Sequence, residues 1–190
     1  MANLTFYYAT MAAGKSTSCL QLNHSLKSQG FTPLLVKSSV DTRDAGEIKS
    51  RIGISQKCEI ILPEQNIFDT LKPKLFGITH ILVDEVQFLS KKQIDDLGDI
   101  VDLLNIDVVC FGLRTSYTGE LFESSSRLFA IADNIIELPL MYKDGNKCIM
   151  HLRIVDGNSV FSGSDIVVGG DEVYKSVSRS KWKMEKNKHE

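Results

Sequence analysis

Eight residues near the N-terminus have the spacing of a phosphate-binding loop. Residues 9–16 read Ala-Thr-Met-Ala-Ala-Gly-Lys-Ser and end in the Gly-Lys-Ser of the Walker A pattern G-x-x-x-x-G-K-[ST]. In that pattern backbone N–H groups and a helix N-terminus bind phosphate, Lys15 reaches the β- and γ-phosphates, and Ser16 binds Mg²⁺. The departure is Ala9, where the pattern has glycine. Alanine disfavours a positive φ, so Ala9 argues against one particular turn geometry at this position but not against phosphate binding.

A pair of acids follows an apolar run further along the chain. Ile81-Leu82-Val83 is followed by Asp84 and Glu85, which is the Walker B arrangement. Because adjacent strand residues point to opposite sides, Asp84 can serve the metal while Glu85 faces a second substrate as general base. Ser16 and Asp84 are thus the expected Mg²⁺ ligands, and the expected nucleotide-binding residues are Ala9, Thr10, Met11, Ala12, Ala13, Gly14, Lys15, Ser16, Thr17, Asp84, Glu85, Val86 and Gln87.

The segments around these motifs alternate between strand and helix patterns. Strands are expected at 4–8, 33–36, 60–62, 80–85 and 107–113. Helices are expected at 16–29, at 66–75 with an interruption at Pro73, and at 91–104 with Ser90 as its cap. Residues 38–56 are polar and aperiodic, which predicts a long surface loop. This alternation predicts an α/β fold: a P-loop parallel sheet flanked by helices, with the active site at the strand carboxyl ends.

The pattern changes at Pro139, where turn signals begin to separate short β-like runs. These signals lie at 143–146, 156–158 and 169–171 and predict a small β-rich C-terminal appendage. We therefore expect a P-loop α/β domain at 1–138 and a β-rich domain at 139–182. The remaining residues, 183–190, are expected to form a charged flexible tail.

Composition and charge exclude several classes of protein. The net charge of -2 and the sequence pI near 6.1 give no general basic field, which argues against nucleic acid as the main partner. No apolar run approaches the ~20 residues of a membrane span, and the N-terminus lacks a signal pattern. The four cysteines form no C-x-x-C pair, so neither a disulfide framework nor a cysteine zinc cluster is indicated. We expect a cytoplasmic protein with no membrane partner.

Five segments in order along the chain resemble those of cytosolic thymidine kinases, and together they span residues 4–182. Beside the P-loop with Lys15, residues 84–88 resemble the D-E-x-Q-F segment of that family, and residues 41–43 its D-T-R loop. Residues 112–115 and 119–122 resemble the G-L-R-T and G-x-L-F segments of the bacterial and phage-like branch. Residues 167–170 with Tyr174 resemble the V-I-G-G and Tyr of the lasso loop.

The resemblance implies transfer of the γ-phosphate of ATP to the 5′-hydroxyl of thymidine, with Mg²⁺. It makes Glu85 the base, with Lys15, Asp41 and Arg43 acting near the phosphate and sugar. It also implies a homotetramer inhibited by dTTP. An apolar slot with aromatic walls suits a thymine ring. The implied nucleoside-binding residues are Met11, Phe88, Leu113, Tyr117, Phe122, Val167, Gly169 and Tyr174.

The largest departure from the family concerns zinc. The family usually anchors its lasso with a structural zinc ion, and the matching positions here are Tyr142, Asp144, Ser178 and Lys181, none of them cysteine or histidine. Cys148 and His151 lack partners at zinc spacing. We therefore expect no structural zinc, and packing by residues such as Tyr142 and Trp182 in its place.

Two other functions compete with the kinase. One is a P-loop switch or regulatory ATPase whose nucleotide state orders the 38–56 loop. The other is a degenerate relative that binds nucleotide without catalysis, an idea motivated by Ala9 and the missing zinc ligands. Retention of Lys15, Asp84, Glu85 and Arg43 favours the enzyme. The choice between thymidine and deoxyuridine is left open by the residues.

Overall fold

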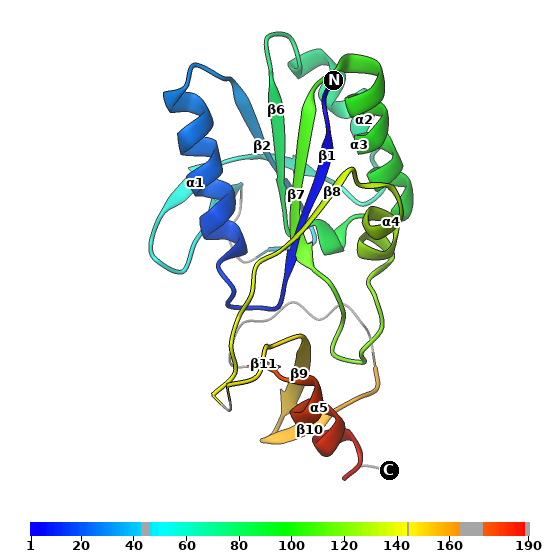
Figure 1. The fold of residues 1–190 in the computed structure, drawn as a ribbon. Helices are drawn as coiled ribbons and strands as arrows, with labels where there is room; N and C mark the ends of the chain where they lie inside the picture. The colour runs from blue at the N-terminus through cyan, green and yellow to red at the C-terminus, as the bar shows by residue number, and fades with distance from the viewer. Residues whose placement is uncertain (43–45, 144, 164–172, 189–190) are drawn as a thin grey trace.

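A six-stranded parallel sheet forms the centre of the computed structural model, which describes residues 1–42, 46–143, 145–163 and 173–188. The strand order is β5-β2-β6-β7-β1-β8, and every neighbouring pair runs parallel (Figure 1). The strands that carry the predicted motifs, β6, β7 and β1, are therefore consecutive neighbours inside the sheet, and none of them is at an edge. The strands are β1 Leu4–Ala9, β2 Pro33–Ser38, β5 Glu59–Ile61, β6 His80–Asp84, β7 Asp107–Leu113 and β8 Asn134–Glu137.

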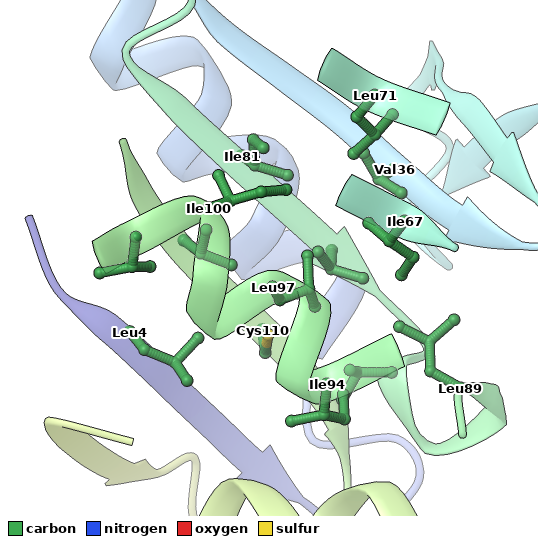
Figure 2. Close-up of a cluster of buried hydrophobic side chains, with 14 of the residues drawn as sticks. Leu4, Val36, Ile67, Leu71, Ile81, Leu89, Ile94, Leu97, Ile100 and Cys110 are labelled. Atoms are coloured by element: carbon green, nitrogen blue, oxygen red, sulfur yellow. The ribbon is translucent and has the colours of Figure 1, made fainter. Parts of the chain in front are cut away.

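Helices cover both faces of this sheet. Helix α1 (Lys15–Ser28) packs on one face, while α2 (Ile67–Leu71), α3 (Lys91–Leu104) and α4 (Glu123–Ile131) lie on the other (Figure 1). Strand β6 shows why its run is continuously apolar: Ile81 and Val83 belong to the core under α3, and Leu82 to the core under α1. Figure 2 shows Leu97 and Ile100 of α3 pointing into the first of these cores. The predicted fold class is confirmed.

Local signals in the sequence account for where several helices begin and end. Helix α3 starts with a capping box in which the Ser90 hydroxyl accepts from the Gln93 N–H and the Gln93 side chain accepts from the Ser90 N–H. Helix α2 gives way to a 3-10 turn at Lys72–Lys74, which contains Pro73. The expected interruption of the 66–75 helix is therefore confirmed. No helix within the described ranges has both the length and the apolar run needed to cross a bilayer.

The prediction that 38–56 is a loop without regular structure is wrong in part. Strands β3 (Glu47–Lys49) and β4 (Ser55–Lys57) form an antiparallel hairpin. Ile48 is its buried residue, 1% exposed, and it packs in the α1-side core with Leu20 and Leu82. A three-residue strand with one buried side chain leaves no periodicity in the sequence, which is why the pattern missed it.

A second sheet lies beyond the carboxyl edge of the large one (Figure 1). It has the order β10-β9-β11 and is antiparallel throughout, and we call it the C-terminal sheet. Its hairpin turns at Asp156 and Gly157, which both have positive φ (48° and 79°), as the predicted turn at 156–158 requires. The strands are β9 Met150–Val155, β10 Asn158–Val160 and β11 Tyr174–Val177. The predicted turn at 169–171 lies outside the described residues.

The expected flexible tail at 183–190 is partly replaced by helix. Helix α5 runs over Arg179–Lys186, with the Ser178 hydroxyl accepting from the Lys181 N–H at its start. A Lys181–Glu185 ion pair spans one turn, and the Trp182 ring meets Phe161 edge-on with centroids 5.6 Å apart. Trp182 is one apolar contact in a lysine-rich segment, and one such residue gives little hydrophobic periodicity. The many charges were therefore the main signal in the sequence, and they indicated a flexible tail.

Candidate active site

The phosphate loop connects β1 to α1 and has the shape that its motif requires. Gly14 has φ 81° at the helix start, and an added Cβ there would meet nothing within 4 Å. Ala12 also adopts a left-handed conformation, with φ 64°, which costs a non-glycine residue on the order of 1 kcal/mol. Lys15 is 7% exposed, and its Nζ donates to the Thr10 carbonyl at 2.9 Å. The lysine is thus held across its own loop, beside the space that a phosphate would take.

A cavity of 480 Å³ opens at this loop. Three of the residues expected in the site, Arg43, Val167 and Gly169, lie outside the described residues. Thr10 and Ala13 belong to the phosphate loop without lining the cavity, while Ala9 and Val86 are buried at 4% and 0% exposure. The expected residues that the fold brings together around the cavity are Met11, Ala12, Gly14, Lys15, Ser16, Thr17, Asp41, Asp84, Glu85, Gln87, Phe88, Leu113, Tyr117, Phe122 and Tyr174.

Asp84 ends β6, lines the cavity and is 2% exposed. Burial, helped by the neighbouring charge of Glu85, raises the pKa of Asp84 from 3.8 to about 7, against the Ser16 hydrogen bond and the Lys15 charge. Its Oδ1 has no hydrogen-bond partner in the described part of the chain. A buried carboxylate oxygen next to a serine hydroxyl is the hard-oxygen donor set that Mg²⁺ prefers. The residues therefore fit a Mg²⁺-nucleotide.

Glu85 lies one residue beyond β6, with a left-handed backbone of φ 53°. Its Oε2 accepts from Nε2 of Gln87, and the Gln87 Oε1 accepts from the Leu113 N–H at 3.0 Å. These two hydrogen bonds require a glycine at position 112, because a Cβ there would lie 2.5 Å from Val86 Cγ1 and would push β7 away from Gln87. The end of β7 thus orients Gln87, and Gln87 orients the Glu85 carboxylate.

Aromatic side chains form part of the cavity wall, which we call the aromatic wall. Tyr117 and Tyr174 are 1% and 9% exposed, with ring centroids 6.3 Å apart. The Arg153 guanidinium lies 5.4 Å from the Tyr117 centroid and donates to its hydroxyl at 3.4 Å. Phe88 and Phe122 line the same cavity. A flat apolar ring fits such a wall.

Asp41 meets a partner that the sequence patterns did not point to. Lys37, at the end of β2, holds Asp41 in a salt bridge of 3.0 Å, with both side chains 3% exposed. The Lys37 Nζ also donates to the Glu47 carbonyl at 3.3 Å, which ties the β3–β4 hairpin to the site. The available signal was a lysine directly after the apolar run 34–36, because a charged side chain at the end of an inner strand needs a partner.

Several other cavity residues were not expected. They come from the β3–β4 hairpin, the segment after β7 and strand β9. Thr115 ends the G-L-R-T segment, and the others belong to no motif and reach the cavity only through the tertiary fold. They are Lys49, Ser50, Arg51, Ile52, Thr115, Ser116 and His151.

The positions that match the zinc ligands of the family have other contacts here. Tyr142 packs against the apolar cluster of the C-terminal sheet, Ser178 caps α5, and Lys181 pairs with Glu185. Asp144 lies outside the described residues. Within the described ranges no group of three or more His, Cys, Asp or Glu side chains could hold a metal ion. That zinc is absent stays a prediction.

Comparison with known proteins places this chain among nucleoside kinases. A family model described as thymidine kinase matches residues 2–182. The thymidine kinase of Mannheimia succiniciproducens is 43% identical, covering 99% of this chain and 98% of that protein. The thymidine kinase of Enterobacteria phage T4 is 44% identical over 96% of each chain. That of Haemophilus influenzae is 42% identical over 96% of this chain and 97% of its own. The chain belongs to the thymidine kinase family.

Proposed function

We propose that this protein is an ATP-dependent thymidine kinase, which transfers the γ-phosphate of ATP to the 5′-hydroxyl of thymidine and yields dTMP. The observation that carries the proposal is the shared cavity. It joins the phosphate loop at Lys15, the acid pair at Asp84 and Glu85, and an aromatic wall at Tyr117 and Tyr174. A phosphoryl donor, a base and a flat-ring acceptor can therefore meet in one space.

The phosphate side works by charge and by orientation. The loop N–H groups and the buried Lys15 ammonium would bind the β- and γ-phosphates and stabilise the charge that develops during transfer. Ser16 and Asp84 would hold Mg²⁺, which neutralises phosphate charge when it is bound. Asp41, with Lys37 as its partner, and Arg43 would act near the sugar and the transferred group.

Glu85 would take the proton from the 5′-hydroxyl as the oxygen attacks the γ-phosphorus. It suits this role because the Gln87 hydrogen bond fixes its carboxylate beside the cavity, while Asp84 next to it would hold the metal. The new bond joins the 5′-oxygen to the γ-phosphorus, the bond to the β–γ bridging oxygen breaks, and ADP leaves.

The aromatic wall would select a pyrimidine nucleoside. Met11, Phe88, Leu113, Tyr117, Phe122 and Tyr174 would contact the base and sugar, with Val167 and Gly169 closing over the ring. Thymidine, and deoxyuridine less well, should fit the cavity, whereas the two-ring purines should not.

Further features of the proposal rest on the family resemblance. Residues 1–138 would form the ATP-binding domain, and 139–182 the lasso that covers the nucleoside. The enzyme would act in the cytoplasm as a homotetramer, serve DNA synthesis through nucleoside salvage, and be inhibited by dTTP. The lasso would do without zinc.

The test uses purified protein with Mg-ATP and each common nucleoside, and measures the monophosphate formed. We expect dTMP from thymidine, some dUMP from deoxyuridine, and no purine product. Lys15→Ala should lower turnover by about 10²–10³-fold or more. Glu85→Gln should also abolish turnover but keep thymidine affinity, because it removes the base while Lys15, the one of the two that serves the phosphates, stays in place. Rapid phosphorylation of deoxyadenosine, or near-normal turnover by Glu85→Gln, would contradict the proposal.

A further inference from the structure

The C-terminal sheet binds the phosphate loop directly, through both peptide groups of Met11. The Met11 N–H donates to Nε2 of His151 at 2.9 Å, and the Ser176 hydroxyl donates to the Met11 carbonyl at 2.8 Å. His151 belongs to β9 and Ser176 to β11, and the two residues stand opposite each other in the antiparallel pairing. One pair of cross-strand neighbours therefore fixes the backbone at Met11.

His151 is built into this position as a neutral acceptor. It is 2% exposed, and burial, with the nearby charges of Lys15 and Arg114, lowers the pKa of its imidazole from 6.5 to about 3. A hydrogen bond to the backbone of Thr115 opposes that shift, as expected for an N–H that the ring donates. Since Nε2 accepts from Met11, the proton belongs on Nδ1. The ring thus joins the phosphate loop to the segment after β7.

The phosphate loop needs support at this point. Ala12, the next residue, holds an unfavourable left-handed conformation, and such strain persists only where the surroundings enforce it. The Met11 carbonyl belongs to the same peptide group as the Ala12 N–H, so fixing this carbonyl also fixes the direction of that N–H. The N–H groups from Ala12 to Lys15 are those that the Walker A loop presents to phosphate. A change at Met11 would therefore re-aim the donors that follow.

We propose that His151, assisted by Ser176, is a positioning residue that holds the phosphate loop in its nucleotide-binding conformation. The sheet that bears Tyr174 of the aromatic wall thereby also sets the affinity for the phosphates of the nucleotide. The inference rests on one part of the proposed function, namely that the phosphate loop binds a Mg-nucleotide.

The experiment measures equilibrium binding of Mg-ADP without nucleoside, so it does not depend on turnover. His151→Leu keeps the approximate volume but leaves the partly buried Met11 N–H without its acceptor, and we expect affinity to fall about tenfold. His151→Gln supplies an amide oxygen for Met11 and an amide N–H for Thr115, so it should stay within about threefold of the unchanged protein. Ser176→Ala should weaken binding a few-fold, because a backbone carbonyl loses one donor.

Lys175→Ala is the matched control, since Lys175 lies next to Ser176 on β11 and is exposed. It should leave Mg-ADP affinity unchanged. Circular dichroism and thermal unfolding check that each variant is folded at the temperature of the assay. Thymidine affinity, measured alone, should change less than Mg-ADP affinity in His151→Leu.

The outcomes separate a positioning role from a purely structural one. Folded His151→Leu that binds Mg-ADP normally would overturn the inference, as would a His151→Gln variant as weak as His151→Leu. If the unchanged protein binds Mg-ADP with this pattern of variant effects but does not phosphorylate thymidine, the inference stands and the proposed function fails.

Discussion

The two sheets of this protein are stabilised in different ways. The large sheet is enclosed between two cores, and residues such as Leu82, Leu97 and Ile100 are fully buried in them. Each such side chain contributes about 1.5–3 kcal/mol. The apolar cluster of the C-terminal sheet has only Met150, Leu152 and Val177 as buried members within the described residues. A core that small cannot hold a sheet alone, so the C-terminal sheet depends on its contacts with the large one.

Those contacts converge on the active site. The Trp182 indole N–H donates to the Tyr117 carbonyl at 3.0 Å, and Arg114 donates to the Ile149 carbonyl at 3.3 Å. His151 bonds Met11 of the phosphate loop. The interactions that stabilise the C-terminal sheet are thus the ones that position residues lining the cavity. A substitution that weakens the C-terminal sheet should therefore impair substrate binding at a loss of stability too small to unfold the large sheet. The following experiments test this difference.

The largest effect is expected from Gly112→Ala, inside the large sheet. The added methyl would lie 2.5 Å from Val86 Cγ1 and 3.3 Å from the Gln87 backbone nitrogen, so the turn that carries Glu85 must move. We expect about 1–3 kcal/mol of destabilisation and a fall in kcat of about 10–100-fold from the displaced base. Steady-state kinetics and urea unfolding measure the two effects.

Gly98→Ala is the control for this substitution. Gly98 lies inside α3, and an added Cβ would find only Ile131 Cδ1, at an ordinary 3.7 Å. Alanine there should stabilise the protein by roughly 0.5–1 kcal/mol and leave kcat unchanged. Unaltered kcat in Gly112→Ala would mean that the approach of β7 to Val86 does not position Glu85.

A smaller and more local effect is expected from Trp182→Ala, on the C-terminal side. The change removes the hydrogen bond to Tyr117 and the ring contact with Phe161, about 2–3 kcal/mol of docking energy. Thymidine KM should rise several-fold, and hydrogen exchange should quicken in β9 and β11 but not in β6 or β7. Met184→Ala, exposed on the same helix, is the control. Equal quickening in both sheets would mean that they unfold as one unit.

The pH dependence of stability tests the same contact between the sheets. The folded pKa of His151 is about 3 against 6.5 for an ordinary histidine, so below pH 6.5 the unfolded chain binds one more proton than the folded chain. Because of this group alone, the free energy of unfolding should fall by about 1 kcal/mol at pH 6 and by about 2 kcal/mol at pH 5. His151→Gln should remove that part of the loss. Urea unfolding at pH 7.5, 6 and 5 measures it, and superimposable pH curves would show that His151 is not buried neutral.

The sequence predicted the large sheet better than the small one because their signals differ in kind. Continuous apolar runs such as 81–83, the Ser90 cap and Pro73 act locally, and the structure follows them. The β3–β4 hairpin and α5 each depend on one buried or half-buried side chain, Ile48 or Trp182, which no periodicity reveals.

The candidate site divides in the same way. The Walker motifs have fixed local spacing, and they led to Lys15, Ser16, Asp84 and Glu85, which line one cavity. Lys37 and His151 reach the same cavity from separate strands. Lys37 also bonds the Glu47 carbonyl of the β3–β4 hairpin, and His151 bonds Met11, 140 residues away in the sequence. Such pairs depend on three-dimensional proximity, which one sequence cannot supply.

The smallest effect, none at all, is expected from removing zinc. A structural zinc ion needs four ligands and can contribute on the order of 10 kcal/mol to folding, so a site that loses one ligand gains little by keeping the rest. Ser178, Lys181 and Tyr142, at three of the four matching positions, already serve as helix cap, ion-pair partner and packing residue. The C-terminal sheet should therefore be held by packing and docking alone.

Metal analysis should accordingly find no stoichiometric zinc, and a zinc-selective chelator should change neither the melting temperature nor the activity once Mg²⁺ is restored. A relative that keeps its zinc ligands, treated in parallel, provides the positive control and should lose stability. About one zinc ion per chain, or irreversible inactivation by the chelator, would contradict the prediction. Either result would also remove the reason for the expected sensitivity of Trp182→Ala, because a metal would then stabilise the sheet that Trp182 is taken to dock.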